Sequence, residues 1–151
     1  MAPGEKVAIV GPTGSGKTTL ISLVTRLYDV QEGRILLDGV DVREIPLHKL
    51  RRAVATVPQD VFLFTGTVAE NISLHNASAD WRVVEHAAQE VRANRFIAKL
   101  PRGYAEEVGE EGRRLSEGQR QLLGLSRAFA RDPGLVILDE ATSNIDSETE
   151  N

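Results

Sequence analysis

The sequence predicts an α/β domain with a parallel sheet, a small antiparallel β hairpin and an inserted helical region. Three short runs rich in apolar residues, at residues 7–10, 54–57 and 135–138, are typical of strands, and the last is a continuous apolar run of the kind covered on both faces of a parallel sheet. The segments between these runs contain apolar residues at helical spacing, which predicts covering helices. The pair Asp38-Gly39 is flanked by alternating apolar residues and is typical of a tight hairpin turn.

The first half of the chain is predicted to form a strand, a helix, a hairpin and a second strand. Residues 7–10 are expected to form the first strand, which ends at Gly11. Apolar residues at i, i+3, i+4, i+7 and i+8 predict the helix that follows, and they are Leu20, Leu23, Val24, Leu27 and Tyr28. The hairpin is expected over residues 33–42, and residues 54–57 form the next strand, which ends before Pro58.

The second half is predicted to contain two longer helices and a last strand. A helix from about residue 80 to 100 is indicated by four apolar residues on one face, which are Val84, Ala87, Ala88 and Val91. The next helix is expected over about residues 117–131, with three side chains directed inward: Leu122, Leu125 and Phe129. Arg131 and Pro133 favour the end of that helix, and residues 135–138 then form the last strand.

Length and composition exclude several classes of protein. The 151 residues are enough for about one domain, and 18 basic against 22 acidic side chains give a net charge of −4, which argues against a nucleic-acid partner. The absence of cysteine excludes disulfides and thiolate metal sites. No apolar stretch reaches the roughly 18 residues that a membrane span needs, so the segment itself is expected to be soluble.

Residues 11–18 match the pattern G-x-x-x-x-G-K-[ST], between a predicted strand and a predicted helix. Glycines in such a loop let backbone N–H groups turn toward phosphate oxygens at the positive end of the helix. Lys17 is expected to reach the β- and γ-phosphates, the Thr18 hydroxyl to hold Mg²⁺, and Thr19 to reach the α-phosphate. The candidate ATP-binding residues are Gly11, Thr13, Gly14, Ser15, Gly16, Lys17, Thr18 and Thr19. The alternative is a glycine-rich turn with an exposed lysine.

Two adjacent carboxylates, Asp139 and Glu140, follow directly on the last predicted strand. Ligands of open α/β sheets bind at the carboxyl ends of the strands, so we expect both acids on the side of the phosphate loop. Asp139 would hold Mg²⁺ and Glu140 would polarise the attacking water. The alternative is a solvated acidic strand end.

The segment from Leu115 to Gln119 opens the helix predicted at about residue 117. Ser116 and Gln119 fit the S/T-x-x-E/Q capping box, which explains the helix start. A cap does not need Gly118, which costs about 1 kcal/mol in a helix relative to alanine. A glycine there favours close approach of a phosphate to the backbone, and both interpretations can hold together.

The sequence resembles an ATP-binding cassette (ABC) nucleotide-binding domain over essentially its whole length. The motifs that carry the resemblance are, in order, the phosphate loop, Gln59, residues 115–119, residues 135–140 and residues 143–146. The signature of this family is usually L-S-G-G-Q, and Glu117 replaces its middle glycine here. The last motif resembles the D-loop S-A-L-D and retains Ser143 and Asp146.

Two further segments resemble exporters within that family. Residues 57–72 look like the Q-loop and the segment after it, and residues 107–112 resemble the T-E-V-G-E-R-G stretch before the signature, with Glu106 in place of the threonine. The resemblance makes part of the surface at residues 62–64 a groove for a transmembrane coupling helix. The alternative for Phe62, Leu63 and Phe64 is plain core packing.

The resemblance implies an ATPase that binds ATP and Mg²⁺ between two cassettes arranged head to tail. The phosphate loop of one chain would hold the phosphates, and the partner's signature, Leu115, Ser116, Glu117, Gly118 and Gln119, would close on the γ-phosphate. Glu140 would be the general base, with Gln59 and Lys17 as the other catalytic residues, and Asp146 would bridge the two sites. The metal ligands would be Thr18, Gln59 and Asp139.

As partners, the resemblance implies a second cassette, identical or different, and an exporter's transmembrane domain in the same or a separate chain. The location would be the cytoplasmic face of a membrane. Residues 1–58 and 132–151 would form a RecA-like P-loop NTPase core with the hairpin, and about 59–131 the Q-loop, helical subdomain and signature helix.

Two features of the family are missing from the sequence. No aromatic residue precedes Gly11 to stack on adenine, and His48, His75 and His86 all lie before Asp139, so none matches the switch histidine. We therefore expect a cassette truncated at both ends, with weak or no activity as an isolated chain.

Three alternative functions compete with the exporter ATPase. The first is a nucleotide-binding fragment without turnover, which the missing histidine favours. The second is an ABC ATPase outside transport, but the short spacing from Gln59 to Ser116 and the absence of cysteine leave no room for the insertions of that class. A P-loop kinase would leave the signature and the D-loop unexplained.

Overall fold

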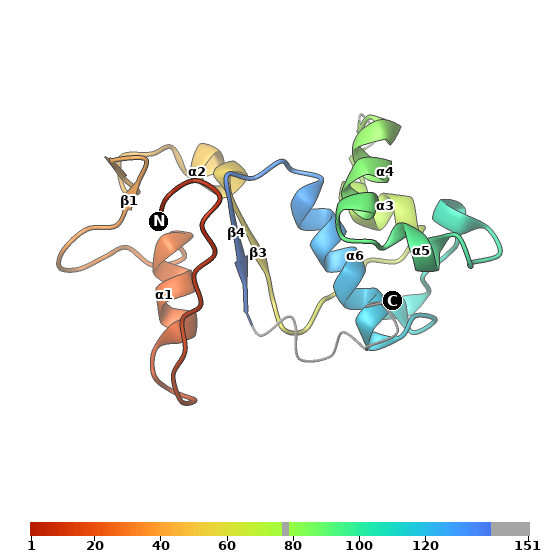
Figure 1. The fold of residues 1–151 in the computed structure, drawn as a ribbon, viewed down its shortest axis with the longest axis horizontal. Coiled ribbons are helices and arrows are strands. Elements are labelled where there is room, and N and C mark those ends of the chain that lie inside the picture. Colours follow the sequence, from red (N-terminus) through yellow and green to blue (C-terminus); the bar gives the residue numbers. More distant parts are fainter. Residues whose placement is uncertain (77–78, 140–151) are drawn as a thin grey trace. The chain divides into compact units, whose positions relative to one another are not determined.

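The computed structural model describes residues 1–76 and 79–139 of the chain (Figure 1). The chain divides into two compact units, Met1–Arg51 and Arg52–Asn151. A parallel strand pair, an antiparallel hairpin and packed helices are all present, which confirms the predicted α/β class. None of the helices in the described ranges is long and apolar enough to cross a bilayer.

The predicted hairpin is confirmed in the first unit. Strand β1 (Leu36–Leu37) pairs antiparallel with β2 (Val40–Asp41), and Leu37 lies opposite Val40. Asp38 and Gly39 between them have φ values of 50° and 82°, as a two-residue turn that matches the twist of the strands requires. Each strand has only 2 residues, so the hairpin is much shorter than the predicted range 33–42. Alternating apolar residues predict the position of the turn better than they predict the length of the strands.

Arg43 ties this hairpin to the loop that precedes it. Its guanidinium donates to both carboxylate oxygens of Asp41, at 3.0 and 2.7 Å, and to the carbonyl oxygens of Val30 and Gly33, at 3.3 and 3.2 Å. The hydrogen bonds from Arg43 lower the pKa of Asp41 to about 2. Asp41 therefore stays ionised and keeps the guanidinium in place.

Helix α1 (Lys17–Val24) is confirmed but ends earlier than its apolar periodicity predicts. Arg26 takes a φ of 51°, and its N–H donates to the carbonyl of Leu23 while that of Leu27 donates to Ser22. These bonds form a Schellman C-cap with arginine at the position that glycine usually occupies. Leu27 and Tyr28 consequently lie beyond the helix and are exposed.

The prediction of a strand at residues 7–10 is wrong for this structure. These residues have no strand assignment, and Val7, Ile9 and Val10 are 52%, 59% and 88% exposed. A β strand is stable only when neighbouring strands satisfy its backbone groups, and none of the described residues pairs with this run. The β-branched residues of this run favour an extended backbone, but a strand also needs a neighbouring strand to pair with.

The second unit is built on a parallel strand pair and a group of helices. β3 (Val54–Val57) and β4 (Leu135–Leu138) pair in parallel, from Val54 opposite Leu135 to Val57 opposite Leu138, and both confirm the sequence prediction. Helix α2 (Leu47–Ala53) leads into β3. In Figure 1 the two strands lie side by side and end at the same edge.

The helices of this unit share one apolar core. They are α3 (Val68–Ser73), α4 (Trp81–Glu90), α5 (Asn94–Ile97) and α6 (Glu117–Phe129), with short 3₁₀ turns at Gly103–Ala105 and Glu110–Gly112. Helices α3, α4 and α6 pack against one another (Figure 1). The core comprises Leu63, Val68, Ile72, Val84, Ala87, Ala88, Ala93, Ile97, Val108, Leu115, Leu122 and Leu123.

The single helix predicted over about 80–100 is two helices, because Arg92 takes a left-handed φ of 60° between α4 and α5. The inward face of α4 is as predicted, with Val84, Ala87 and Ala88 buried. In α6, Leu122 is buried and Leu125 packs against the core. Phe129 is 38% exposed, so its inward placement is only partly correct.

Helices α2 and α3 lie outside the predicted elements. Helix α3 begins with a complete capping box, in which the Thr67 hydroxyl accepts from the N–H of Glu70 and the Glu70 carboxylate accepts from the N–H of Thr67. The pattern T-x-x-E is a visible helix-start signal in the sequence. It could have identified α3.

Replacement of Gly124 by alanine is expected to lower the melting temperature of the protein. A Cβ at this position of α6 would lie 2.7 and 2.9 Å from the two γ-carbons of Val61, a stiff side chain. Such overpacking costs about 1–3 kcal/mol, which outweighs a gain in helix propensity of about 1 kcal/mol. Thermal unfolding of the purified variant tests this.

The matched control is Gly134→Ala, because a Cβ there meets only the Ala53 carbonyl at 3.7 Å, an ordinary contact. This variant should melt close to the wild type. Val61→Ala should also make Gly124→Ala less harmful, since it removes both γ-carbons. An unchanged melting temperature for Gly124→Ala alone would contradict the close packing of α6 on Val61.

Candidate functional site

The loop before α1 has the backbone of a phosphate-binding nest. Gly14 and Gly16 have φ values of 82° and 90°, which glycine adopts without strain. A Cβ on Gly11 would lie 2.7 Å from the hydroxyl oxygen of Ser15, so the loop closes tightly at its start. The N–H of Ser15 donates to the carbonyl of Pro12 at 3.1 Å and completes the turn.

Helix α1 presents unpaired donors at its N-terminus. Gly16 is the N-cap and makes no side-chain cap, and the first turn carries no acidic residue. Within the described residues, no acceptor binds the N–H groups of Gly16, Lys17, Thr18 and Thr19. Backbone donors at the positive end of a helix are suited to an anion such as a phosphate group.

Lys17 is held over this loop. Its Nζ donates to the carbonyl oxygens of Gly11, at 2.8 Å, and Pro12, at 3.0 Å. An ammonium group has three donors, so one remains for another acceptor. The residues therefore fit a polyphosphate, with the positive charge already directed at the loop.

Two predicted site residues lie at one edge of the β3–β4 pair. Strand β3 ends at Val57, two residues before Gln59, and β4 ends at Leu138, directly before Asp139. The N–H of Asp139 donates to the carbonyl of Val57 at 3.0 Å, which extends the pairing by one residue. The structure therefore brings Gln59 and Asp139 to the carboxyl ends of adjacent parallel strands, where ligands of α/β sheets bind.

The predicted signature forms the N-terminus of α6. Ser116 is the N-cap, and the full capping box with Gln119 is present: Ser116 Oγ accepts from the N–H of Gln119 at 3.3 Å, and Gln119 Oε1 accepts from that of Ser116 at 3.0 Å. Leu115 is buried, whereas Ser116 and Glu117 are exposed. The start of the helix is therefore accessible at Ser116 and Glu117.

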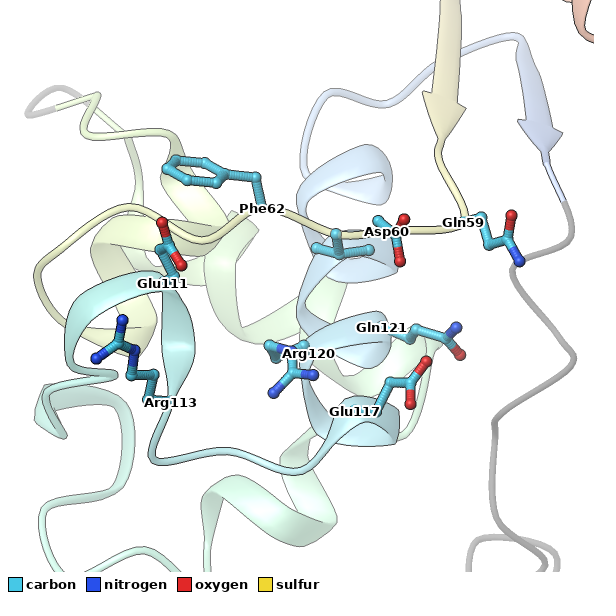
Figure 2. A pocket seen from close by; sticks show the side chains of 9 residues that line it. Gln59, Asp60, Phe62, Glu111, Arg113, Glu117, Arg120 and Gln121 are labelled. Carbon is cyan, nitrogen blue, oxygen red and sulfur yellow. The ribbon is translucent and has the colours of Figure 1, made fainter.

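An open hollow of about 460 Å³ separates this helix start from the segment after β3. Figure 2 shows Glu117, Arg120 and Gln121 on α6 and Gln59, Asp60 and Phe62 on that segment. Gln121 is almost fully buried, and within the described residues its amide has no hydrogen-bond partner. The hollow therefore joins Gln59 to the signature helix along a partly polar wall.

Some predicted residues are not described. Glu140, Ser143 and Asp146 lie outside the described residues, so their predicted roles stay predictions. The phosphate loop belongs to the first unit, and Gln59, Asp139 and the signature belong to the second.

Two residues that organise the second unit, Asn71 in α3 and Arg127 in the last turn of α6, are not predicted by any motif in the sequence. Arg127 donates to the carbonyls of Phe62 and Asn71 and to the Asn71 side chain, across 56 to 65 residues of sequence. Basic residues are common in the last turn of any helix. No local pattern therefore distinguishes Arg127 from a solvated arginine.

Comparison with known proteins gives consistent results. The family model described as ABC transporter matches residues 1–143. The chain is 50% identical over 147 residues to the iron-sulfur clusters transporter atm1, mitochondrial, of Aspergillus fumigatus. The aligned residues cover 97% of this chain and 20% of that protein. It is also 50% identical over 147 residues to the ATP-dependent lipid A-core flippase of Chromohalobacter salexigens, covering 97% of this chain and 25% of the flippase.

A solved structure shows the same fold. The structure of a bacterial Atm1-family ABC exporter with ATP bound has a TM-score of 0.84 and 42% sequence identity, over 92% of this chain and 24% of that one. The chain thus spans a quarter or less of these similar proteins. Because the family model matches residues 1–143, nearly the whole chain, the chain belongs to the ABC transporter family.

Proposed function

We propose that this chain is the ATP-binding and ATP-hydrolysing cassette of an ABC exporter, and that it couples hydrolysis to export through a transmembrane domain. The observation that carries the proposal is the loop of residues 11–19, with unpaired N–H groups at the start of α1 and Lys17 held above them. The chain is similar to an ATP-dependent flippase and to an exporter with ATP bound, which supports a nucleoside triphosphate as the ligand of this loop.

The roles of the residues follow from their chemistry. The N–H groups of residues 16–19 and the Lys17 ammonium bind and orient the phosphates, while Thr18, Gln59 and Asp139 supply the oxygen ligands that Mg²⁺ prefers. When bound, Mg²⁺ neutralises charge on the β- and γ-phosphates. Glu140 accepts the proton of the attacking water, so catalysis rests on positioning and electrostatics.

The proposed partner of the cassette is a second cassette. Ser116 and Gly118 at the exposed start of α6 close on ATP bound to a second cassette arranged head to tail, and Asp146 bridges the two sites. In this arrangement residues 1–58 and 132–151 form the nucleotide-binding core, and 59–131 form the helical part. Nothing in the net charge of −4 favours a nucleic-acid partner.

We propose that the transmembrane domain contacts the cassette at Phe62 and Phe64. Phe62 and Phe64 are 57% and 45% exposed, and their rings meet edge to face at 5.3 Å. Two adjacent exposed aromatic rings form an apolar surface suited to a helix of the transmembrane domain. This contact would hold the cassette at the cytoplasmic face of the membrane.

Phosphate release by the purified complete protein tests the proposal. We expect release that requires Mg²⁺, stops on chelation by EDTA and saturates with ATP. A fluorescent ATP analogue should bind in the same range of concentration. Binding without any release would instead favour a nucleotide-binding cassette without turnover, and absence of both would contradict the proposal.

A further inference from the structure

The segment after Gln59 has two faces. Val61 packs against the backbone of α6 at Gly124, and Leu63 is fully buried beside Gly112. Phe62 and Phe64, between and after them, point outward and are exposed. The two exposed rings are therefore carried by a backbone that is fixed on its inner side.

Arg127 fixes this backbone from α6. Its Nη1 donates to the carbonyl of Phe62 at 2.9 Å, its Nε to the carbonyl of Asn71 at 3.0 Å, and its Nη2 to Asn71 Oδ1 at 3.0 Å. The guanidinium also lies 5.5 Å from the centre of the Phe64 ring, within the range of a cation–π contact. One side chain thus joins α6, α3 and the aromatic segment.

Asn71 completes the connection from α3. Its side-chain oxygen accepts from the N–H of Phe64 at 2.9 Å, and its side-chain nitrogen donates to the carbonyls of Phe64, at 2.9 Å, and Thr67, at 3.0 Å. The amide therefore pairs with the Phe64 backbone in both directions. Asn71 is itself fully buried, whereas the Phe64 side chain is partly exposed, so the amide holds the segment from its inner side.

Arg127 is held by oxygen acceptors and an aromatic ring rather than by an ion pair in the part of the chain that the structure describes. Within the described residues its partners are carbonyl and amide oxygens and the Phe64 ring, and no carboxylate pairs with it. Burial lowers the pKa of Arg127. Its three hydrogen bonds use the planar fork of the guanidinium, which a lysine ammonium cannot reproduce.

Helix α6 links this cluster to the signature. Ser116 is the N-cap of α6 and Arg127 lies in its last turn, roughly 16 Å away at 1.5 Å per residue. Ser116 and Arg127 are therefore held at opposite ends of one continuous helix.

We infer that Arg127 and Asn71 are positioning residues that make the exposed Phe62–Phe64 surface move with the signature helix. The inference rests on the proposed function, since it assigns the link between the transmembrane contact and the partner's ATP. Without the Arg127 fork, the aromatic segment would still fold onto Val61 and Leu63 but would no longer respond to closure at Ser116.

Hydrogen–deuterium exchange of the complete protein tests this inference. The protein carries Glu140→Gln to retain ATP, and exchange is compared with and without Mg-ATP in the peptides covering residues 11–19, 115–120 and 61–65. With Arg127 present, we expect all three peptides to gain protection on ATP binding. With Arg127→Lys, the gain should persist in the first two peptides and be lost at residues 61–65.

Three comparisons make the result decisive. A purely structural role would raise exchange at 61–65 in both states and leave the ATP-dependent difference in place, which would overturn the inference. Asn71→Ser should give the same loss as Arg127→Lys, and the double variant no more, since the two residues act as a unit. Arg82→Lys on the exposed face of α4 conserves charge in the same way and should change nothing.

The outcome also separates this inference from the proposed function. Absence of ATP-dependent protection at residues 11–19 in every variant would contradict nucleotide binding itself. Protection at 11–19 with an undiminished response at 61–65 in Arg127→Lys would overturn only the positioning role. If neither Arg127→Lys nor Asn71→Ser yields folded protein, the contacts serve stability alone and the positioning role is likewise wrong.

Discussion

Glu140→Gln in the complete protein is expected to lower ATP hydrolysis by about 10²–10⁴-fold, the usual contribution of a general base. Glutamine has nearly the same shape but cannot accept a proton from water. Glu140 follows Asp139, whose N–H is bound to the carbonyl of Val57 at the end of the β3–β4 pair. Because the change leaves the phosphate loop untouched, the affinity for ATP should stay close to that of the wild type.

Lys17→Ala is the matched contrast to Glu140→Gln. It removes a charge-assisted bond to phosphate worth about 1.5–3 kcal/mol, so ATP affinity should fall roughly ten- to a hundredfold, and loss of the charge that stabilises the transition state should abolish turnover as well. Phosphate release and equilibrium binding of ATP, measured on both variants, separate the two effects. Unchanged turnover in Glu140→Gln, with turnover abolished in Lys17→Ala, would contradict the role of Glu140 and leave that of the phosphate loop intact.

The parts of the fold that the sequence predicts are those with local causes. The Asp38-Gly39 turn needs only two residues with positive φ, and the capping box of Ser116 and Gln119 needs only a pair three residues apart. The glycine-rich loop likewise carries its own conformation in Gly14 and Gly16. Such features can be read from a few adjacent residues.

The parts that the sequence does not predict depend on distant partners or on single backbone angles. Residues 7–10 have the composition of a strand but pair with none of the described residues. Arg92 breaks a helical pattern that is otherwise continuous, through one left-handed φ. The Arg127–Asn71 contacts join residues 56 positions apart, and neither residue type indicates its partner.

Gly118→Asp is expected to abolish hydrolysis without destabilising α6. Gly118 lies in the first turn, where an acidic side chain is favourable to the helix by about 0.3–1 kcal/mol. The same carboxylate would repel the γ-phosphate of ATP held by a second cassette. Melting temperature should therefore be unchanged or slightly raised while phosphate release is lost.

Mixing Lys17→Ala chains with Gly118→Asp chains then distinguishes a shared site from a site within one chain. In a head-to-tail pair of the two variants, one site carries both substitutions and the other carries neither. Random pairing makes about half the dimers mixed, each with one intact site of two, so activity should return to about a quarter of the wild-type rate. Each variant alone should stay inactive, because both of its sites contain the substitution.

The recovery depends on Ser116 and Gly118 acting on the partner's ATP, since these residues lie at the exposed start of α6. If the signature acted on the phosphate loop of its own chain, every chain in the mixture would be defective and no activity would return. Recovery therefore requires that a loop with Lys17 from one chain meets an α6 with Gly118 from another. A mixture as inactive as its components would contradict the head-to-tail pairing of identical cassettes, while the binding of ATP to Gly118→Asp chains would still report an intact phosphate loop.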